Sequence, residues 1–392
     1  MRSVVIVGAK RTAIGDFLGS LSSVPAVDLG TTVVKAALEQ SGVQPEQVED
    51  VVGGMVYKAG VKGNPARQVQ LNARIPVTAG AVTVEQQCSS AMRAMEVACQ
   101  QIILNKSDIS VAFGIESMSR VPYYMLDART GFRMGPSKVE DGLLYDALHD
   151  AFQGYHMGFT AENLAERYNI TREEQDELAY LSHTRAVKAI QEGTFKDEIV
   201  PVEIKSKKKA IIFDTDEHPR ADVTKEKLAA LGTPFKKDGT VTAGNASGIN
   251  DGAAAMVLMA EEKAKELGIK SLARITATAT YGVAPEIMGI GPAYVIPKAL
   301  KIAGLNARDI DYYEINEAFA AQFLACNREL KLDMERVNAN GSGIALGHPV
   351  GCTGIRIVTT LIYEMMRRQG RYGVASLCVG GGPAMATVLE IL

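Results

Sequence analysis

Residues 338–356 read NANGSGIALGHPVGCTGIR, and five glycines fall within the fourteen residues from Gly341 to Gly354. Glycine permits positive φ and close backbone approach, so a segment this rich in glycine is typical of a tight, functional loop. His348 lies in its middle, and Pro349 restricts the histidine backbone to extended or turn geometry. We therefore expect a stiff turn that presents the imidazole of His348. The alternative is a glycine-rich turn with an incidental histidine.

On the N-terminal side of this loop, the chain alternates short apolar runs with helical patterns. Strands are predicted at residues 4–7, 48–55, 83–88 and 109–114. Helices are predicted at residues 27–40 and 89–104. This alternation indicates an α/β protein built from stacked layers.

The C-terminal third repeats the pattern of the N-terminal third. Gly42 and the apolar residues before it can be laid over Gly304 and its neighbours at an offset of 262 residues. The same offset brings Cys88 close to His348. We therefore expect a duplicated α/β unit. Its halves would place Cys88 and His348 at equivalent strand-to-helix junctions, facing each other across a pseudo-two-fold axis.

The segment between the two halves differs from them in its sequence pattern. Helical patterns at residues 160–168 and 172–192 and a lysine-rich run at 205–209 indicate an inserted loop or lid domain, with the lysines on a solvated face. Beyond it, we interpret the apolar run 253–259 as a helix and 261–268 as a helix and loop. The predicted division is an N-terminal half (1–119 plus 246–270), a loop domain (120–245) and a C-terminal half (271–392).

Length and composition limit the classes of function. At 392 residues the chain exceeds the size of a single core, and its net charge of -3 gives neither a nucleic-acid footprint nor an acidic tail. Five widely spaced cysteines form no C-x-x-C pair and suit a reducing compartment. No apolar stretch approaches the roughly 20 residues that span a bilayer. We expect a soluble cytoplasmic protein without nucleic-acid or membrane partners.

Two of the cysteines lie in settings that suit chemistry. Cys88 follows an extended run and begins a helix, where the dipole and free amides favour a thiolate. Cys378 precedes three glycines, beginning with Gly380, whose amides could line an oxyanion site. Asn316 is expected at the head of another helix, where capping is its ordinary role. The remaining cysteines, Cys99, Cys326 and Cys352, are interpreted as structural, which is the usual role of a free cysteine.

Four motifs, in this order, resemble those of the thiolases. They are VEQQCSSAM around Cys88, NEAFA from Asn316, NGSGIALGHPVGCTG around His348, and CVGGG from Cys378. The resemblance covers the whole chain and is greatest for biosynthetic acetyl-CoA acetyltransferases. It implies a five-layered αβαβα core from two halves, a loop domain for CoA binding and oligomer contacts, and a homotetramer that is a dimer of dimers. No metal and no cofactor are implied, because coenzyme A is substrate and product.

The resemblance also implies roles for the motif residues. Cys88 would carry the acetyl group, His348 would activate it, and Cys378 would remove the α-proton of a second acetyl-CoA to give acetoacetyl-CoA and CoA. Asn316, through a water, and His348 would stabilise one oxyanion, and the amides of Cys88 and Gly380 the other. Residues expected to contact CoA or the acyl group are Arg220, Ser247, His156, Met157, Phe235, Phe319, Met288, Leu148 and Ala318.

Departures from the family pattern are Glu85, where asparagine is common, Pro383 with Ala384 after the glycines, and Cys352. They place the rate and local geometry in question rather than the reaction class. A carboxylate at Glu85 would raise the Cys88 pKa if it faced the pocket. Because two thiols that serve adjacent carbons must converge, we also expect Cys88 and Cys378 to be able to form a disulfide.

Three other functions fit the sequence less well. A dinucleotide-binding oxidoreductase is disfavoured because Gly341-x-Gly343-x-x-x-Gly347 has the wrong spacing for that fingerprint. A thiolase-like lipid-binding protein without chemistry would not need both cysteines and the histidine. The nearest alternative is a degradative 3-ketoacyl-CoA thiolase of broader chain length. His156, Met157 and Met288 resemble the short-chain branch, in which bulk limits the acyl pocket.

Overall fold

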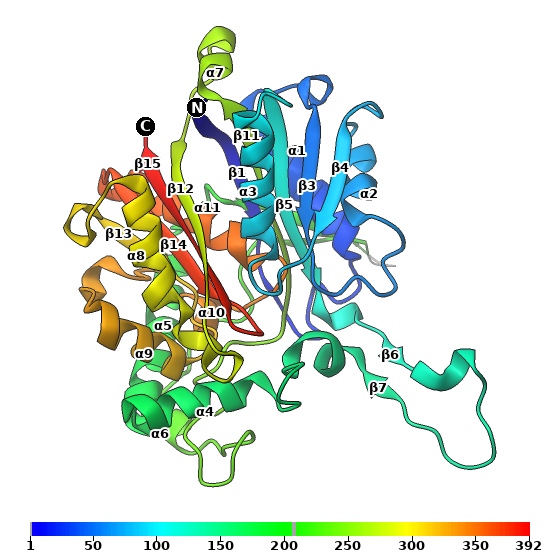
Figure 1. Ribbon diagram of the computed structural model, residues 1–392, viewed down its shortest axis with the longest axis vertical. Helices are drawn as coiled ribbons and strands as arrows, with labels where there is room; N and C mark the ends of the chain where they lie inside the picture. The colour runs from blue at the N-terminus through cyan, green and yellow to red at the C-terminus, as the bar shows by residue number, and fades with distance from the viewer. Residues whose placement is uncertain (1, 206–208) are drawn as a thin grey trace.

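A mixed sheet of eleven strands crosses the described part of the computed structural model, residues 2–205 and 209–392 (Figure 1). Its main path runs β13-β14-β15-β12-β1-β11-β5-β3-β4, while β2 pairs with β11 and β8 with β1. The strands are β1 (Val4–Thr12), β2 (Gly15–Asp16), β3 (Asp50–Gly54), β4 (Gly80–Val84), β5 (Ile109–Ser117), β8 (Ile199–Val200), β11 (Asn250–Ala260), β12 (Ala273–Gly282), β13 (Tyr312–Ile315), β14 (Tyr372–Cys378) and β15 (Pro383–Ile391).

Two similar halves meet in the middle of this sheet. In one, β3 is parallel to β4 and β5, and β11 is antiparallel to β5 and β1. In the other, β13 is parallel to β14, and β15 is antiparallel to β14 and β12. The halves join where β1 pairs with β12, through Val5↔Arg274 and Ile6↔Ala273. The predicted duplication is therefore confirmed.

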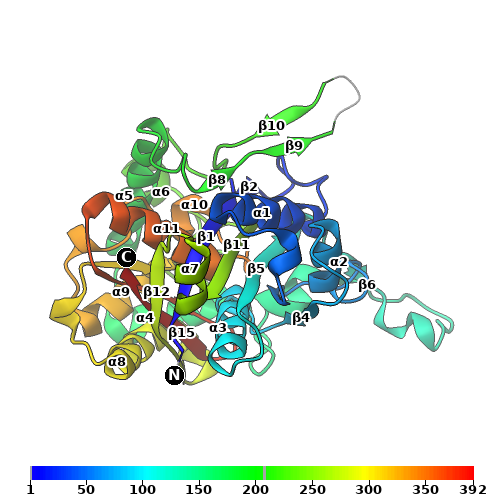
Figure 2. The same ribbon diagram turned by 90° about the horizontal axis from the view of Figure 1, so that it is seen from above.

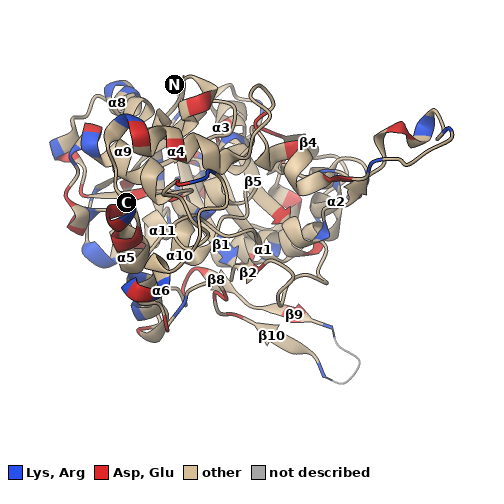
Figure 3. Ribbon diagram, turned by 90° about the horizontal axis from the view of Figure 1, so that it is seen from below, with Lys and Arg blue, Asp and Glu red and all other residues tan. Residues whose placement is uncertain are grey.

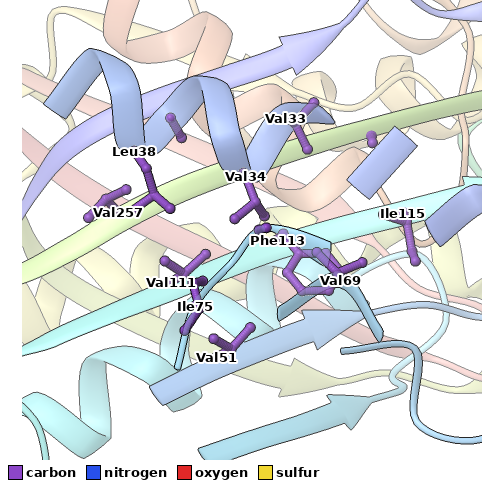
Figure 4. Packing of buried hydrophobic residues seen from close by; sticks show 14 of the residues in the cluster. Val33, Val34, Leu38, Val51, Val69, Ile75, Val111, Phe113, Ile115 and Val257 are labelled. Carbon is purple, nitrogen blue, oxygen red and sulfur yellow. The ribbon is translucent and has the colours of Figure 1, made fainter. Parts of the chain in front are cut away.

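Helices form three layers around the two half-sheets. α1 (Ala26–Ser41) and α2 (Pro65–Asn72) share a core with one face of the first half, and α8 (Gly291–Ala303) and α9 (Ala320–Leu330) with one face of the second. α3 (Ser90–Ile103) and α11 (Thr353–Arg368) share a core with strands of both halves. Figure 4 shows the first of these cores, in which Val34 and Leu38 of α1 lie over Val111 and Val257. The order is the predicted αβαβα.

The ends of the helices follow local sequence signals. α1 and α8 both end at a glycine in the left-handed region, Gly42 with φ 72° and Gly304 with φ 71°. Such a residue closes the last turn at no steric cost, and glycine is the usual choice. The predicted helices 27–40, 89–104 and 172–192 correspond to α1, α3 and α5 (Arg172–Gln191). Thr171 caps α5 in a reciprocal capping box with Glu174.

One predicted element is wrong in type. The apolar run 253–259, interpreted as a helix, is the middle of strand β11. Alternate residues of this strand enter different cores: Ala255 and Val257 face the α1 layer, while Met256 and Leu258 face α3 and α11. A strand buried on both faces shows no alternation of polar and apolar residues, so periodicity cannot separate it from a buried helix.

Residues 120–245 wrap around one end of the sheet and send out two arms. One arm carries β6 (Tyr123–Tyr124) and β7 (Glu140–Asp141) (Figure 1), and the other is the hairpin of β9 (Val202–Ile204) and β10 (Ile211–Phe213) (Figure 2). The segment also contains α4 (Met157–Tyr168), which starts earlier than the predicted 160–168, α5 and α6 (Lys225–Ala229). Part of the lysine-rich run, residues 206–208, lies outside the described residues. The division of the chain at residues 120, 246 and 271 stays a prediction.

The remaining elements are short. α7 (Glu261–Leu267) ends at Gly268, as predicted, and α10 (Gly343–Leu346) lies in the glycine-rich loop. Short stretches of 3-10 or π helix are Pro45–Gln47, Met118–Arg120, Leu126–Arg129, Leu144–Leu148, Pro285–Ile290, Ala307–Asp309 and Met334–Arg336. Figure 3 shows basic and acidic residues interspersed on outer helices such as α5 and α9. In the described ranges, no helix is both long and apolar enough to cross a membrane.

Candidate active site

A pocket of about 310 Å³ receives residues from segments far apart in the sequence. Three of the four motif residues, Cys88, His348 and Cys378, line it together with Gly380. The fourth, Asn316, does not line it. The rest of the lining is Gln87, Met118, Ala147, Leu148, His156, Met157, Phe235, Ala243, Ala246, Ser247, Gly248, Ile249, Met288, Ala318, Phe319 and Val350. Most of these side chains are apolar, which lowers the local dielectric around the two thiols and the imidazole.

Cys88 lies at a sharp bend between β4 and α3. Gln87 before it has a positive φ of 46°, and α3 begins two residues after it, at Ser90. The backbone N–H groups of Gly380 and of Cys88 itself are directed at the sulfur and lower its pKa. Burial outweighs them, however, and raises the Cys88 pKa to about 11, so the predicted preference for a thiolate is not found in the free protein. The thiol therefore needs a base.

The imidazole of His348 reaches the same pocket from the loop between α10 and α11. Its backbone N–H donates to Asn250 Oδ1 at 2.9 Å, and its Nδ1 lies 2.6 Å from Thr353 Oγ1. The hydroxyl of Thr353 donates to the carbonyl of Pro349 at 2.9 Å, so its oxygen accepts from Nδ1–H. The lone pair is then on Nε2, which has no protein partner within the described residues. Burial lowers the His348 pKa to about 3 and keeps the ring neutral.

Cys378 ends β14, directly before the turn that contains Gly380. The side chain is buried, and burial together with the nearby Cys88 thiol raises its pKa well above the ordinary value. Gly381 and Gly382 have φ values of 84° and 105°, which require glycine. This turn carries the N–H of Gly380 back to the sulfur of Cys88. One strand end thus places a second thiol and a hydrogen-bond donor beside the first thiol.

Asn316 is not at the head of a helix, contrary to the prediction. It follows β13, its backbone N–H donates to Ser376 at 2.9 Å, and α9 begins four residues later with Phe319 as its cap. Neither atom of its fully buried amide has a protein partner among the described residues. It is not part of the pocket lining. A buried amide with free donor and acceptor atoms is a suitable holder of a water molecule.

The residues predicted to contact CoA divide clearly. Ser247, His156, Met157, Phe235, Phe319, Met288, Leu148 and Ala318 line the pocket. Arg220 does not; its side chain is 62% exposed, and its guanidinium lies 4.0 Å from the carboxylate of Asp16. The ring of His156 stacks on Phe235 with centroids 4.6 Å apart, and burial lowers the His156 pKa to about 4. A neutral imidazole stacked on a phenyl ring suits an uncharged chain such as pantetheine.

Sequence reasoning missed the residues that hold His348 in place, because they touch no ligand. Asn250 and Glu116 lie in none of the four motifs, Thr353 lies in the motif of His348 but was given no role, and all three are identified only by their hydrogen bonds. Glu85, which was flagged as a departure, lies outside the pocket lining. Its carboxylate accepts from the backbone N–H of Gln87, so it stabilises the bend before Cys88, and its charge is a minor contribution to the raised Cys88 pKa.

Comparisons with known proteins agree with this arrangement. Models described as "Thiolase, N-terminal domain" and "Thiolase, C-terminal domain" match residues 4–262 and 269–391. The "Acetyl-CoA acetyltransferase" of Pseudomonas aeruginosa is 50% identical over 390 residues, 99% of each chain. The solved structure of acetyl-CoA acetyltransferase from Syntrophomonas wolfei has a TM-score of 0.99 at 49% identity, covering 100% of both chains. That of human mitochondrial 3-ketoacyl-CoA thiolase has a TM-score of 0.97 at 42% identity, covering 100% of this chain and 99% of the other. The chain therefore belongs to the thiolase family.

Proposed function

We propose that the protein is an acetyl-CoA C-acetyltransferase, which reversibly condenses two molecules of acetyl-CoA to acetoacetyl-CoA and CoA. The observation that carries the proposal is the convergence of two thiols, a neutral imidazole and a backbone N–H in one apolar pocket. Claisen chemistry needs a nucleophile that is also a leaving group, a base at the α-carbon and donors for developing oxyanions. Relatives named acetyl-CoA acetyltransferase match over the full chain.

The first half-reaction loads Cys88. Nε2 of His348 takes the thiol proton as the sulfur attacks the thioester carbonyl of acetyl-CoA. The C–S bond to CoA then breaks, and the departing CoA thiolate takes a proton from Cys378. The products are acetyl-Cys88, protonated His348, a Cys378 thiolate and free CoA.

The second half-reaction consumes that thiolate. Cys378 removes the α-proton of a second acetyl-CoA, and the resulting carbanion attacks the acetyl carbonyl on Cys88. The C–S bond to Cys88 breaks, and protonated His348 returns the proton to the Cys88 sulfur. Acetoacetyl-CoA leaves, and all three groups are again in their starting protonation states. This order accommodates the raised pKa of Cys378, which begins each cycle as a thiol.

Two sets of donors would stabilise the oxyanions of these steps. The N–H groups of Cys88 and Gly380 interact with the Cys88 sulfur in the free protein and lower its pKa; once the thioester forms, the acetyl oxygen would lie beside that sulfur, where the same two groups would donate to it. Protonated His348 and a water held by Asn316 would serve the other thioester oxygen. Asn316 is suited to that task because its buried amide atoms have no protein partner within the described chain.

The proposal is tested with purified protein and acetoacetyl-CoA plus CoA. Thiolysis should consume the β-ketothioester, and brief exposure to acetyl-CoA alone should add one acetyl group per chain at Cys88. Cys88→Ala should abolish both reactions. Mass spectrometry that locates the acetyl group on another residue would contradict the assignment.

A second candidate is a degradative 3-ketoacyl-CoA thiolase of broader chain length. It is favoured by the structural match to the human mitochondrial enzyme of that name. Against it, Met157, Met288 and Phe319 place bulk in the pocket. Thiolysis rates for 3-ketoacyl-CoA substrates of increasing chain length decide between the two. A steep fall beyond four acyl carbons supports the acetyltransferase, and a flat profile supports the alternative.

We also propose a homotetramer, with residues 120–245 as a loop domain that contributes oligomer contacts. The arm with β6 and β7 supports this, because its side chains Tyr123, Met125, Leu126 and Met134 are apolar and exposed. Apolar side chains gathered on a projecting arm commonly mark a contact surface. Light scattering should give four chains per particle. Replacement of residues 126–138 with a short glycine-serine linker should lower that number, and an unchanged mass would contradict the assignment of the arm.

A further inference from the structure

Glu116, near the end of β5, is a fully buried carboxylate beneath the pocket. Its Oε2 accepts from the backbone N–H of Val56 at 3.0 Å and of Gly351 at 2.9 Å, and its Oε1 accepts from Tyr57 at 3.2 Å. Gly351 belongs to the loop of His348, and Val56 and Tyr57 belong to the segment that follows β3. One side chain therefore joins a loop of each half of the molecule.

This contact requires glycine at two positions, because a side chain at either one would collide with neighbouring atoms. A Cβ built on Gly351 would lie 2.5 Å from Glu116 Oε2 and 2.7 Å from the carbonyl oxygen of Ile115. A Cβ on Gly114 would lie 2.5 Å from the carbonyl oxygen of Gly351. Two glycines thus allow the His348 loop to rest directly on β5. Neither has a positive φ, so close approach rather than backbone conformation accounts for them.

The other residues that Glu116 holds pack against Cys88. Val56 and Tyr57 form a buried cluster with Met118 and Val350, and Cys88 packs against this cluster. Val350 is two residues from His348. The segment that packs against Cys88 and the loop that carries His348 are therefore both hydrogen-bonded to Glu116. Burial raises the pKa of Glu116 to about 8 although the three N–H groups lower it, so what this carboxyl group provides is hydrogen-bond acceptors and not a charge that activates the thiol.

We propose that Glu116 is a positioning residue for acyl transfer: by clasping three backbone N–H groups it fixes the His348 loop against the Cys88 segment. The proposal rests on the proposed function. The imidazole and the thiol come from different halves, so their separation depends on how those halves dock. A displacement of about 1 Å between reacting groups can cost roughly 100-fold in rate. No other described side chain accepts from both Gly351 and the segment after β3.

Two substitutions of Glu116 remove its hydrogen bonds to the three backbone N–H groups, one partly and one completely. In Glu116→Gln the amide oxygen can keep the Val56 and Gly351 bonds, while its NH₂ group opposes the N–H of Tyr57. In Glu116→Leu all three N–H groups lose their acceptor. We expect kcat for acetoacetyl-CoA thiolysis to fall about tenfold in the first variant and roughly 100-fold or more in the second. KM should stay within about twofold, because Glu116 does not line the pocket.

Glu162→Gln is the matched control. Glu162 is also buried, and it clasps the backbone N–H groups of Thr240 and Val241, at 2.8 Å each, in the chain that leads to Ser247. Loosening that segment should raise the KM for CoA substrates more than it lowers kcat. If Glu162→Gln showed the same loss of kcat at unchanged KM, then any buried glutamate that accepts from backbone N–H groups would have this effect. That result would overturn the specific role of Glu116.

The experiment measures kcat, KM, the melting temperature and the rate of Cys88 alkylation by iodoacetamide, a readout that needs no thiolase activity. Slower alkylation and lower kcat in Glu116→Gln, at a melting temperature near that of the wild type, support the proposal. Equal kcat and equal alkylation in wild type and Glu116→Gln overturn it, whether or not Glu116→Leu folds. Absence of thiolysis by the wild type would instead overturn the proposed function and leave the alkylation comparison to judge Glu116.

Discussion

The hydroxyl of Thr353 determines which nitrogen of His348 carries the proton, and Thr353→Val removes it at nearly constant volume. In the native protein Thr353 Oγ1 accepts from Nδ1–H at 2.6 Å and donates to Pro349. Valine offers no acceptor, so Nδ1–H would be left buried and unpaired. The ring can escape that cost by moving its proton to Nε2. The basic lone pair would then be on Nδ1, which faces the methyl groups of the valine, and Nε2 would carry the proton.

The size of the effect follows from the hydrogen bond that is lost. A buried donor left without its acceptor costs about 1–3 kcal/mol. If the ring shifts its proton to avoid that cost, the same free energy is needed to restore the productive form before each turnover. At about 1.36 kcal/mol per factor of ten, kcat should fall by roughly 5- to 150-fold. KM should change little, because Thr353 does not line the pocket.

The assay is acetoacetyl-CoA thiolysis by wild type, Thr353→Val and a control with the same substitution elsewhere on α11. Thr359→Val is that control: Thr359 is fully buried, and its hydroxyl has no partner among the described residues. It should leave kcat and KM unchanged. The reasoning is refuted if Thr353→Val keeps at least half of the wild-type kcat at an unchanged melting temperature. It is also refuted if Thr359→Val loses as much activity.

Four further outcomes are expected. Cys378→Ala should still take up the acetyl group at Cys88 but should lose exchange of the acetyl-CoA α-protons with deuterated solvent; exchange at the wild-type rate would exclude Cys378 as the base. Arg220→Ala should raise the KM for acetyl-CoA more than it lowers kcat, and equal Michaelis constants would remove Arg220 from the CoA site. Alkylation of Cys88 in the free protein should accelerate with pH up to about 11, because burial raises its pKa and the thiolate fraction grows as pH approaches that value; a plateau below pH 7 would contradict this. Mild peroxide should inactivate the protein through a Cys88–Cys378 disulfide that dithiothreitol reverses, and peptide maps without the crosslink after activity is lost would count against it.

Local patterns were sufficient for most of the fold. The helices α1, α3 and α5 were predictable because each combines an apolar face with a readable end, such as Gly42 after α1 or the Thr171 capping box before α5. The duplication was predictable because matching helices end at matching glycines. β11 was not predictable, since its residues are buried on both faces and the direction of each side chain depends on layers supplied by the rest of the chain. Its neighbours, not its own sequence, make it a strand.

The residues of the candidate site differed in how far the sequence could predict them. Cys88, His348 and Cys378 were found because each is a reactive type next to glycines or a helix start. Asn316 was found by its motif but misplaced, because asparagine is a common helix cap and the helix begins four residues further on. Glu116 could not be found at all. A glutamate inside an apolar strand gives no local sign that three amides from elsewhere will meet it.

The protonation states of the pocket show why sequence rules about cysteine activation fall short here. A helix start predicts a lowered thiol pKa, yet the fold also buries His348 and leaves Cys88 only partly exposed, in an apolar pocket. Burial then raises the pKa of Cys88 and lowers that of His348, so the thiol and the neutral imidazole are the favoured resting pair. A thiolate formed in advance would be unstable in such a pocket. The proton must therefore move as the sulfur attacks the thioester, when the negative charge passes to an oxygen and the N–H of Gly380 can receive it. Substrate completes the activation that the helix terminus alone does not supply.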